Sequence, residues 1–204
     1  MHGVNHREED ELLRRLRAGD RRACADCIER YGADMYHLAL RLMRDEREAE
    51  DVLQESFTSA FQGIDGFRGH ADLGTWLYRI TYNMAMMRLR RNRPPTVPVE
   101  ETLQGEAPVP RQLHDWCCLP ERELATEEMR DVLEEALDAL SPALRAAFVL
   151  REMEGISTRE SAAVLDISED AVKKRLQRAR LELRELLSAY FQAEAVRSPG
   201  REYG

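Results

Sequence analysis

The sequence predicts an all-α protein of two helical domains joined by a flexible, proline-rich linker, with a helix-turn-helix in the second domain. Leu, Ala, Arg and Glu are abundant and runs of β-branched residues are few, as is typical of helical proteins. Apolar residues recur at helical steps of three and four along most of the chain, but this period is lost between Pro94 and Pro120. With 204 residues, the chain can form two domains that each bury a core.

The first domain is expected over residues 1–93, and its helices are separated by clear stop and start signals. Gly19 stops the first helix, Asp20 caps the second, and Tyr31-Gly32 ends it. The predicted helices span 8–18, 20–32, 34–44 and 47–61. The last of them exposes a dense polar row of Glu48, Glu50, Asp51, Gln54 and Glu55. Such a face is usually a solvated helix side, but it can also dock on a basic partner.

A loop rich in turn residues, 63–74, precedes a helix that Thr75 opens and Pro94-Pro95 ends. Aromatic side chains and cations gather in this stretch, and among them are Phe67, Arg68, His70, Trp76, Asn83, Arg88, Arg90 and Arg91. Proteins use aromatic rings and cations beside a flexible loop to stack unpaired bases and to follow their phosphates. Trp76 and Tyr78 fit a buried core equally well.

Residues 94–120 are interpreted as a mobile linker, because Pro and Gly interrupt them repeatedly. The second domain is expected over 121–190, followed by a tail without pattern over 191–204. Its first helix is predicted over 121–140. Ser141-Pro142 then starts a helix that runs to Arg151, before Gly155.

The segment from Ser157 to Leu187 predicts the helix-turn-helix. Ser157 or Thr158 can cap its first helix, and Asp166-Ile167-Ser168 separates it from the second. The second helix has an apolar stripe of Val172, Leu176, Ala179, Leu183 and Leu186, and its other side presents Lys173, Lys174, Gln177, Arg178 and Arg180. Such a polar face suits phosphates and base edges in a DNA major groove. The alternative is a helical hairpin with a solvated basic face. DNA binding is favoured because the cap, the apolar stripe and the polar face all fit the same placement of the two helices.

The formal net charge of -8 is unusual for a DNA-binding protein. Cations are nevertheless concentrated where nucleic acid is expected, and acidic surface elsewhere suits a basic protein partner. No apolar run approaches the length of a membrane span, and the N-terminus does not resemble a signal peptide, so a cytoplasmic protein without membrane insertion is expected.

Three motifs resemble the extracytoplasmic-function group, the compact two-domain sigma factors of the sigma-70 family. They are EAEDVLQESFTSAF at 48–61, FRGHADLGTWLYRITYNMAMMRLRR at 67–91 and LSPALRAAFVLREMEGISTRESAAVLDISEDAVKKRLQRARLEL at 140–183. The resemblance covers about Asp20 to Leu187 apart from the linker, which is too short and proline-rich to hold a third domain. It implies a sigma factor that binds core RNA polymerase and promoter DNA to direct transcription initiation, including in stress response, without enzymatic activity, cofactor or small-molecule substrate.

The resemblance also implies roles for single residues. It implies that Asp51, Gln54 and Glu55 dock on the clamp helices of the polymerase's largest subunit. Melting of the -10 element and capture of a flipped base fall to Phe67, Arg68, His70, Trp76 and Asn83, with backbone contacts from Arg88, Arg90 and Arg91. Reading of the -35 element falls to Thr158, Arg159, Lys173, Lys174, Gln177 and Arg178. His70 stands where many relatives carry a small or acidic residue, so the preferred -10 sequence is not transferred.

Two other functions compete with this one. A two-domain helix-turn-helix regulator that is not a polymerase subunit would need a sensor, but residues 1–93 offer no credible ligand pocket or phosphoacceptor. An enzyme would need a phosphate loop, a nucleophile motif or a carboxylate constellation, and none is evident in the sequence.

An anti-sigma factor is a further expected partner, because many compact sigma factors have one. We expect each domain to leave a charged or apolar helix face without an intrachain partner, and an inhibitor tethering both faces would gain avidity. The faces concerned are those around Asp51–Glu55 and around Lys173–Arg178.

The cysteines leave two alternatives open. Cys24, Cys27, His114, Cys117 and Cys118 could supply zinc ligands, since structural sites use Cys and His in such pairs. Cys27 also falls on a buried stripe, where a free thiol behaves as a small apolar side chain. We favour the thiol for Cys27 and leave a redox response open for Cys117-Cys118, so no metal site is predicted.

Overall fold

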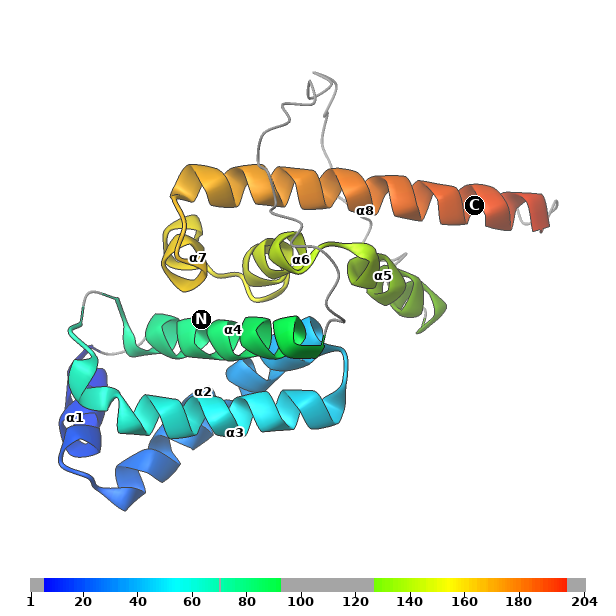
Figure 1. The fold of residues 1–204 in the computed structure, drawn as a ribbon. Helices are drawn as coiled ribbons and strands as arrows, with labels where there is room; N and C mark the ends of the chain where they lie inside the picture. The colour runs from blue at the N-terminus through cyan, green and yellow to red at the C-terminus, as the bar shows by residue number, and fades with distance from the viewer. Residues whose placement is uncertain (1–5, 70, 93–126, 198–204) are drawn as a thin grey trace.

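The computed structural model describes residues 6–69, 71–92 and 127–197, and its regular elements in these ranges are helices (Figure 1). The first layer contains α1 (His6–Arg17), α2 (Arg21–Met43), α3 (Glu46–Gln62), the short η1 (Ile64–Gly66) and α4 (Leu73–Asn92). The second contains α5 (Glu127–Ala139), α6 (Pro142–Phe148), η3 (Val149–Met153), α7 (Thr158–Leu165) and α8 (Glu169–Arg197). The all-α prediction is confirmed. The predicted linker, 94–120, lies outside the described residues.

One continuous helix, α2, replaces the two helices predicted on either side of Gly32. A glycine inside a helix costs only about 1 kcal/mol relative to Ala, so it does not by itself end a helix. Gly32 is buried, and a β-carbon placed there would lie 3.6 Å from Ile28 and 3.9 Å from Phe57. Both distances are ordinary van der Waals contacts, so the site has no steric need for glycine, and the prediction of a break was wrong.

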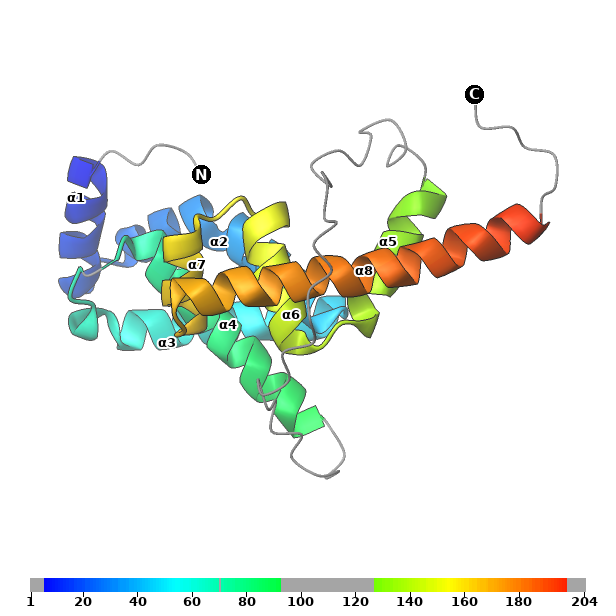
Figure 2. The same cartoon turned by 90° about the horizontal axis from the view of Figure 1, so that it is seen from above.

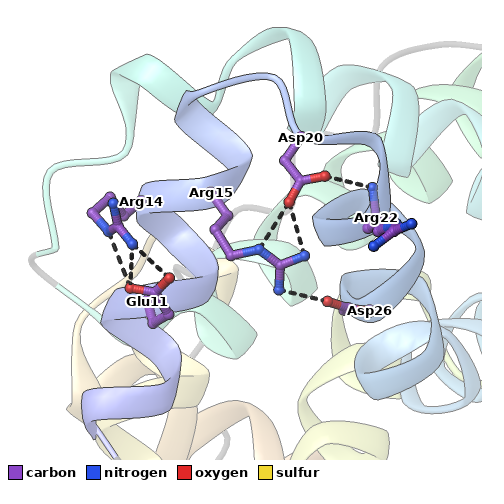
Figure 3. A network of polar contacts seen from close by, with 6 residues as sticks. All are labelled: Glu11, Arg14, Arg15, Asp20, Arg22 and Asp26. Atoms are coloured by element: carbon purple, nitrogen blue, oxygen red, sulfur yellow. Dashed lines mark hydrogen bonds and ion pairs between the residues drawn. The ribbon is translucent and has the colours of Figure 1, made fainter.

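Polar contacts fix α1 to the start of α2 (Figure 3). Asp20 caps α2 by accepting from the backbone N–H of Arg22 at 2.9 Å. The Arg15 guanidinium bonds both Asp20 and Asp26, so it joins the two helices. The Arg22 N–H and then the Arg15 guanidinium hold the pKa of Asp20 below its usual value. On its apolar side, α1 contributes Leu12 and Leu16 to a core shared with α2, α3 and α4.

The two layers pack directly on each other, so part of the apolar surface of each domain has an intrachain partner (Figures 1 and 2). One buried cluster joins Leu38 and Leu42 of α2 to Leu150 of η3 and to Val164 of α7. All four side chains are fully buried. A pattern of helical periodicity identifies an apolar face but does not say which other face covers it.

Ion pairs border this shared core, and in each of them the first layer supplies the cation. Arg79 of α4 lies 3.1 Å from Asp166, and Arg44 lies 2.8 Å from Asp138 of α5. Arg41 of α2 pairs with Glu154. The interface between the layers is therefore complementary in charge as well as apolar.

The last helix, α8, runs to Arg197, beyond the end predicted near Tyr190. No Gly or Pro occurs between Glu169 and Arg197, and Pro199 follows, so the sequence holds no breaker before that point. Ala179, Leu183 and Leu187 of α8 form a second-layer core with α5. None of the described helices is both long enough and apolar enough to cross a membrane.

Candidate functional site

The exposed side of α3 carries the three residues predicted to dock on the polymerase. Asp45 caps the helix by accepting from the backbone N–H of Glu48, and Val52 is buried on its inner side. This register turns Asp51, Gln54 and Glu55 outward, and all three are exposed. The structure thus brings the predicted docking residues together on one surface.

An apolar groove runs beside these residues, between α2 and α3. Its lining includes Ile28, Leu53, Phe57 and Phe61, together with Gln54. Ile28 is 45% exposed, and the rings of Phe57 and Phe61 stack with centroids 5.6 Å apart. A surface that combines carboxylates with exposed apolar side chains suits a partner helix carrying both cations and apolar residues.

Arg88 differs from the other cations at the end of α4. Its guanidinium pairs with Glu48, Asp51 and Glu55 on α3, and its side chain is only 20% exposed. Arg90 and Arg91 are exposed. The sequence predicted that Arg88 contacts the DNA backbone. In the structure its guanidinium instead pairs with the predicted docking surface of α3.

The loop before α4 is only partly open to solvent. Phe67 is 6% exposed and packs on Trp76, with ring centroids 5.2 Å apart, so the ring predicted to contact DNA belongs to the core in this structure. Arg17 donates to the Phe67 backbone carbonyl and holds the loop against α1. Arg68 and Asn83 are exposed. His70 lies outside the described residues.

The second layer covers part of this loop. A cleft of about 570 Å³ lies between them, lined by Phe67 and Thr75 on one side and by Ser157, Arg159 and Ala163 on the other. Arg159 was predicted to contact the -35 element and the loop to contact the -10 element. Residues assigned to two separate DNA elements therefore line the same cleft.

The helix-turn-helix forms as predicted. Ser157 accepts from the Glu160 backbone N–H, and the Glu160 side chain accepts from the Ser157 backbone N–H, which completes a capping box. Asp166 ends α7 in the left-handed conformation, at φ 56°, and Ser168 accepts from the Ala171 backbone N–H at the start of α8. The turn between α7 and α8 is thus held by short polar side chains.

The first turns of α8 separate a buried side from a polar one. Val172 and Ala179 are fully buried, while Lys173 and Lys174 are exposed. Lys173 lies 3.3 Å from Asp170, whose carboxylate is itself 85% exposed. The remaining predicted -35 residues on or next to this face, Thr158, Gln177 and Arg178, are partly exposed. The polar face predicted from the sequence is therefore present.

The described cysteines behave as thiols. Cys27 is 1% exposed, and burial raises its pKa to about 12, with the neighbouring Cys24 adding to the shift. Within the described ranges, no group of three or more His, Cys, Asp or Glu side chains is placed to hold a metal ion. His114, Cys117 and Cys118, for which the sequence left zinc binding or a redox response as alternatives, lie outside the described residues.

Sequence reasoning missed two features of these surfaces. Glu48 was noted only as part of a polar row, although its spacing from Asp51 and Glu55 already puts all three on one helix face. The pairing of Arg41 with Glu154 across the layers had no local signal, because the two residues are 113 positions apart.

Comparisons with protein families match both layers. The model for sigma-70 region 2 matches residues 27–94, and the model for sigma-70, region 4, matches residues 130–183. The RNA polymerase sigma-H factor of Pseudomonas aeruginosa is 33% identical over 87% of this chain and 92% of its own length. The ECF RNA polymerase sigma-E factor of Escherichia coli K12 is 33% identical over 83% of this chain and 88% of its own length.

Solved structures show a similar fold. CnrH, in complex with the cytosolic domain of CnrY, is 27% identical, with a TM-score of 0.64 over 89% of this chain and 97% of that one. The sigma factor RpoE of Bartonella quintana, in complex with the anti-sigma factor NepR, is 23% identical, with a TM-score of 0.58 over 80% of this chain and 96% of that one.

Proposed function

Because the chain belongs to the extracytoplasmic-function group of the sigma-70 family and is an RNA polymerase sigma factor, we propose a division of labour between its two layers. Residues 1–93 form the domain that docks on core polymerase and opens the -10 element. Residues 121–190 form the domain that reads the -35 element. A regulator that acts without being a polymerase subunit is not favoured, because both matched segments are sigma-70 regions.

The observation that carries the proposal is the placement of two charged helix faces of opposite sign. The outward side of α3 presents Asp51, Gln54 and Glu55 beside an apolar groove, which suits a basic protein surface. The start of α8 presents Lys173 and Lys174 on a capped helix-turn-helix, which suits DNA phosphates and base edges. The protein acts by binding and positioning, in the cytoplasm where polymerase and chromosome meet, and is not itself an enzyme.

The packing of the two layers has a consequence for promoter binding. The -10 and -35 elements are separated by roughly 25 base pairs, which is about 85 Å of B-DNA at ~3.4 Å per base pair. In the structure, Arg159 of α7 and Phe67 of the loop line one cleft. The two layers must therefore separate before both elements are bound at once, and we assign the packed arrangement to the inactive protein.

An anti-sigma factor is the partner that would hold this arrangement. The similar protein CnrH was solved with the cytosolic domain of CnrY bound, which supports a partner of this kind. Since each layer already covers part of the other, the partner needs only to stabilise the packed state and to cover the surface around Asp51–Glu55.

Binding to core polymerase tests the proposal. A labelled protein titrated with core enzyme should bind with high affinity, and Asp51→Ala, Gln54→Ala and Glu55→Ala should each weaken binding. Glu46→Ala removes an exposed acid from the same helix outside this set and serves as the matched control. Equal affinity of all four variants would refute the assigned surface.

A further inference from the structure

Arg88 of α4 makes an unusual three-way contact with α3. Its Nε lies 2.5 Å from Glu48, one terminal nitrogen lies 2.6 Å from Asp51 and the other lies 2.9 Å from Glu55. The three carboxylates are spaced three and four residues apart, so they share one helix face. We call these three residues the acidic face.

The geometry depends on a guanidinium. The two terminal nitrogens of Arg88 donate to Asp51 and Glu55, and Nε forms an ion pair with Glu48, so one planar guanidinium serves three carboxylates. A lysine ammonium is a single point charge on a flexible stem and cannot span the same three groups in fixed directions. Arg88 also offsets the repulsion among three like charges on one helix face.

The paired carboxylates still face solvent. The Asp51 and Glu55 side chains are 55% and 50% exposed, whereas Arg88 is 20% exposed. A carboxylate has about four lone-pair positions, so each can accept from Arg88 on its inner side and from a partner's cation on its outer side. Arg88 orders these groups without covering them.

We propose that Arg88 is a positioning residue for polymerase docking rather than a contact to promoter phosphates. The proposal rests on the proposed function, in which Asp51 and Glu55 bind core polymerase. Immobilising flexible side chains during association opposes binding, and side chains already held in place avoid much of that entropy loss. Removing Arg88 would also make the surface more negative, which favours a basic partner, so a loss of affinity on its removal would show that the order of the side chains dominates.

The first experiment compares the affinity for core polymerase of the full-length protein and four variants. Arg88→Ala and Arg88→Lys should each weaken binding by about fivefold to thirtyfold, as expected when two side chains lose their order. Arg90→Ala and Arg91→Ala, which remove exposed cations from the same helix end, should change it less than about twofold. Affinity restored by Arg88→Lys would show that charge alone matters and would overturn the positioning role.

A double-mutant cycle separates positioning from a general effect on stability. If Arg88 acts through Asp51, then Arg88→Ala should weaken core binding much less in an Asp51→Asn background than in the wild type. Additive losses would overturn the proposal, as would an unchanged or tighter affinity of Arg88→Ala. If the wild-type protein itself fails to bind core polymerase, the proposed function fails instead, so the two failures are distinguishable.

Discussion

Arg41 of α2 and Glu154, the residue after η3, form an ion pair that joins the two layers across 113 positions of sequence. The Glu154 carboxylate is nearly buried, with 9% of its side chain exposed, whereas Arg41 is 33% exposed. Tyr78 of α4 interacts with the same carboxylate. Burial raises the pKa of the Tyr78 hydroxyl, and the negative charge of Glu154 is the second largest cause. A buried carboxylate therefore sits at the contact that must break when the layers separate.

Glu154→Gln is predicted to loosen the packed arrangement. The change leaves Arg41 without its counter-charge, and after allowance for the partial exposure of Arg41 the cost should be about 1–2 kcal/mol. Small-angle X-ray scattering of the free protein should show a larger radius of gyration. Glu152→Gln, which removes a pair with Arg180 inside the second layer, is the control. If the wild type, Glu154→Gln and Glu152→Gln have the same radius of gyration, the Arg41–Glu154 pair does not hold the layers together.

Ser157→Ala is predicted to destabilise the helix-turn-helix by about 1 kcal/mol, because it removes the N-cap of α7. Urea unfolding followed by circular dichroism measures the effect. Ser188→Ala, at an exposed position of α8, should leave the midpoint unchanged. A shift of similar size in both variants would mean that the cap contributes nothing specific.

Lys174→Ala and Arg178→Ala are predicted to lower transcription from promoters that depend on the -35 element, without loss of core binding. Each removes a cation from the polar face of α8, so promoter affinity should fall. The slope of the logarithm of affinity against the logarithm of salt concentration should also become shallower by about one. Arg14→Ala removes a 74% exposed cation from α1 and should alter neither quantity. If either α8 variant loses polymerase affinity instead, the face is wrongly assigned.

The buried thiol of Cys27 predicts a loss of stability at alkaline pH. Its pKa is about 12 in the folded protein and 9.0 in the ordinary thiol, so above pH 9 the unfolded chain releases a proton that the folded chain keeps. The contribution is complete below pH 9 and falls as the pH rises towards 12. By pH 10.5 it should have fallen by about 2 kcal/mol, at 1.36 kcal/mol per pKa unit.

The advantage of wild-type over Cys27→Ala should therefore shrink between pH 8 and 10.5 in urea titrations, while the difference from Ser188→Ala, which removes no titrating group, should stay constant. A constant advantage over Cys27→Ala as well would show that the Cys27 thiol ionises alike in the folded and unfolded states.

Local signals in the sequence predicted much of the second layer. Ser157, Asp166 and Ser168 act through hydrogen bonds to residues within three or four positions, so the helix-turn-helix could be placed before any tertiary contact was known. The exposed side of α3 was predicted for the same reason, because its apolar period alone determines which residues face outward.

Contacts between distant segments could not be predicted in this way. Gly32 belongs to a residue type that often ends helices, yet α2 runs through it and packs on α3. Phe67 and Arg88 have the chemistry of DNA contacts, but Trp76 covers the ring and three carboxylates of α3 hold the guanidinium. Which partner such a side chain chooses depends on how helices far apart in sequence are brought together.

Transcription in vitro tests the central claim most directly. Core RNA polymerase with and without this protein would be supplied with genomic fragments, and the transcript starts would be mapped. The account predicts starts that appear only with the protein, share sequence elements near -10 and -35, and lose strength with Asp51→Ala and with Lys174→Ala. Starts that are the same with and without the protein, in preparations where it binds core polymerase, would contradict it.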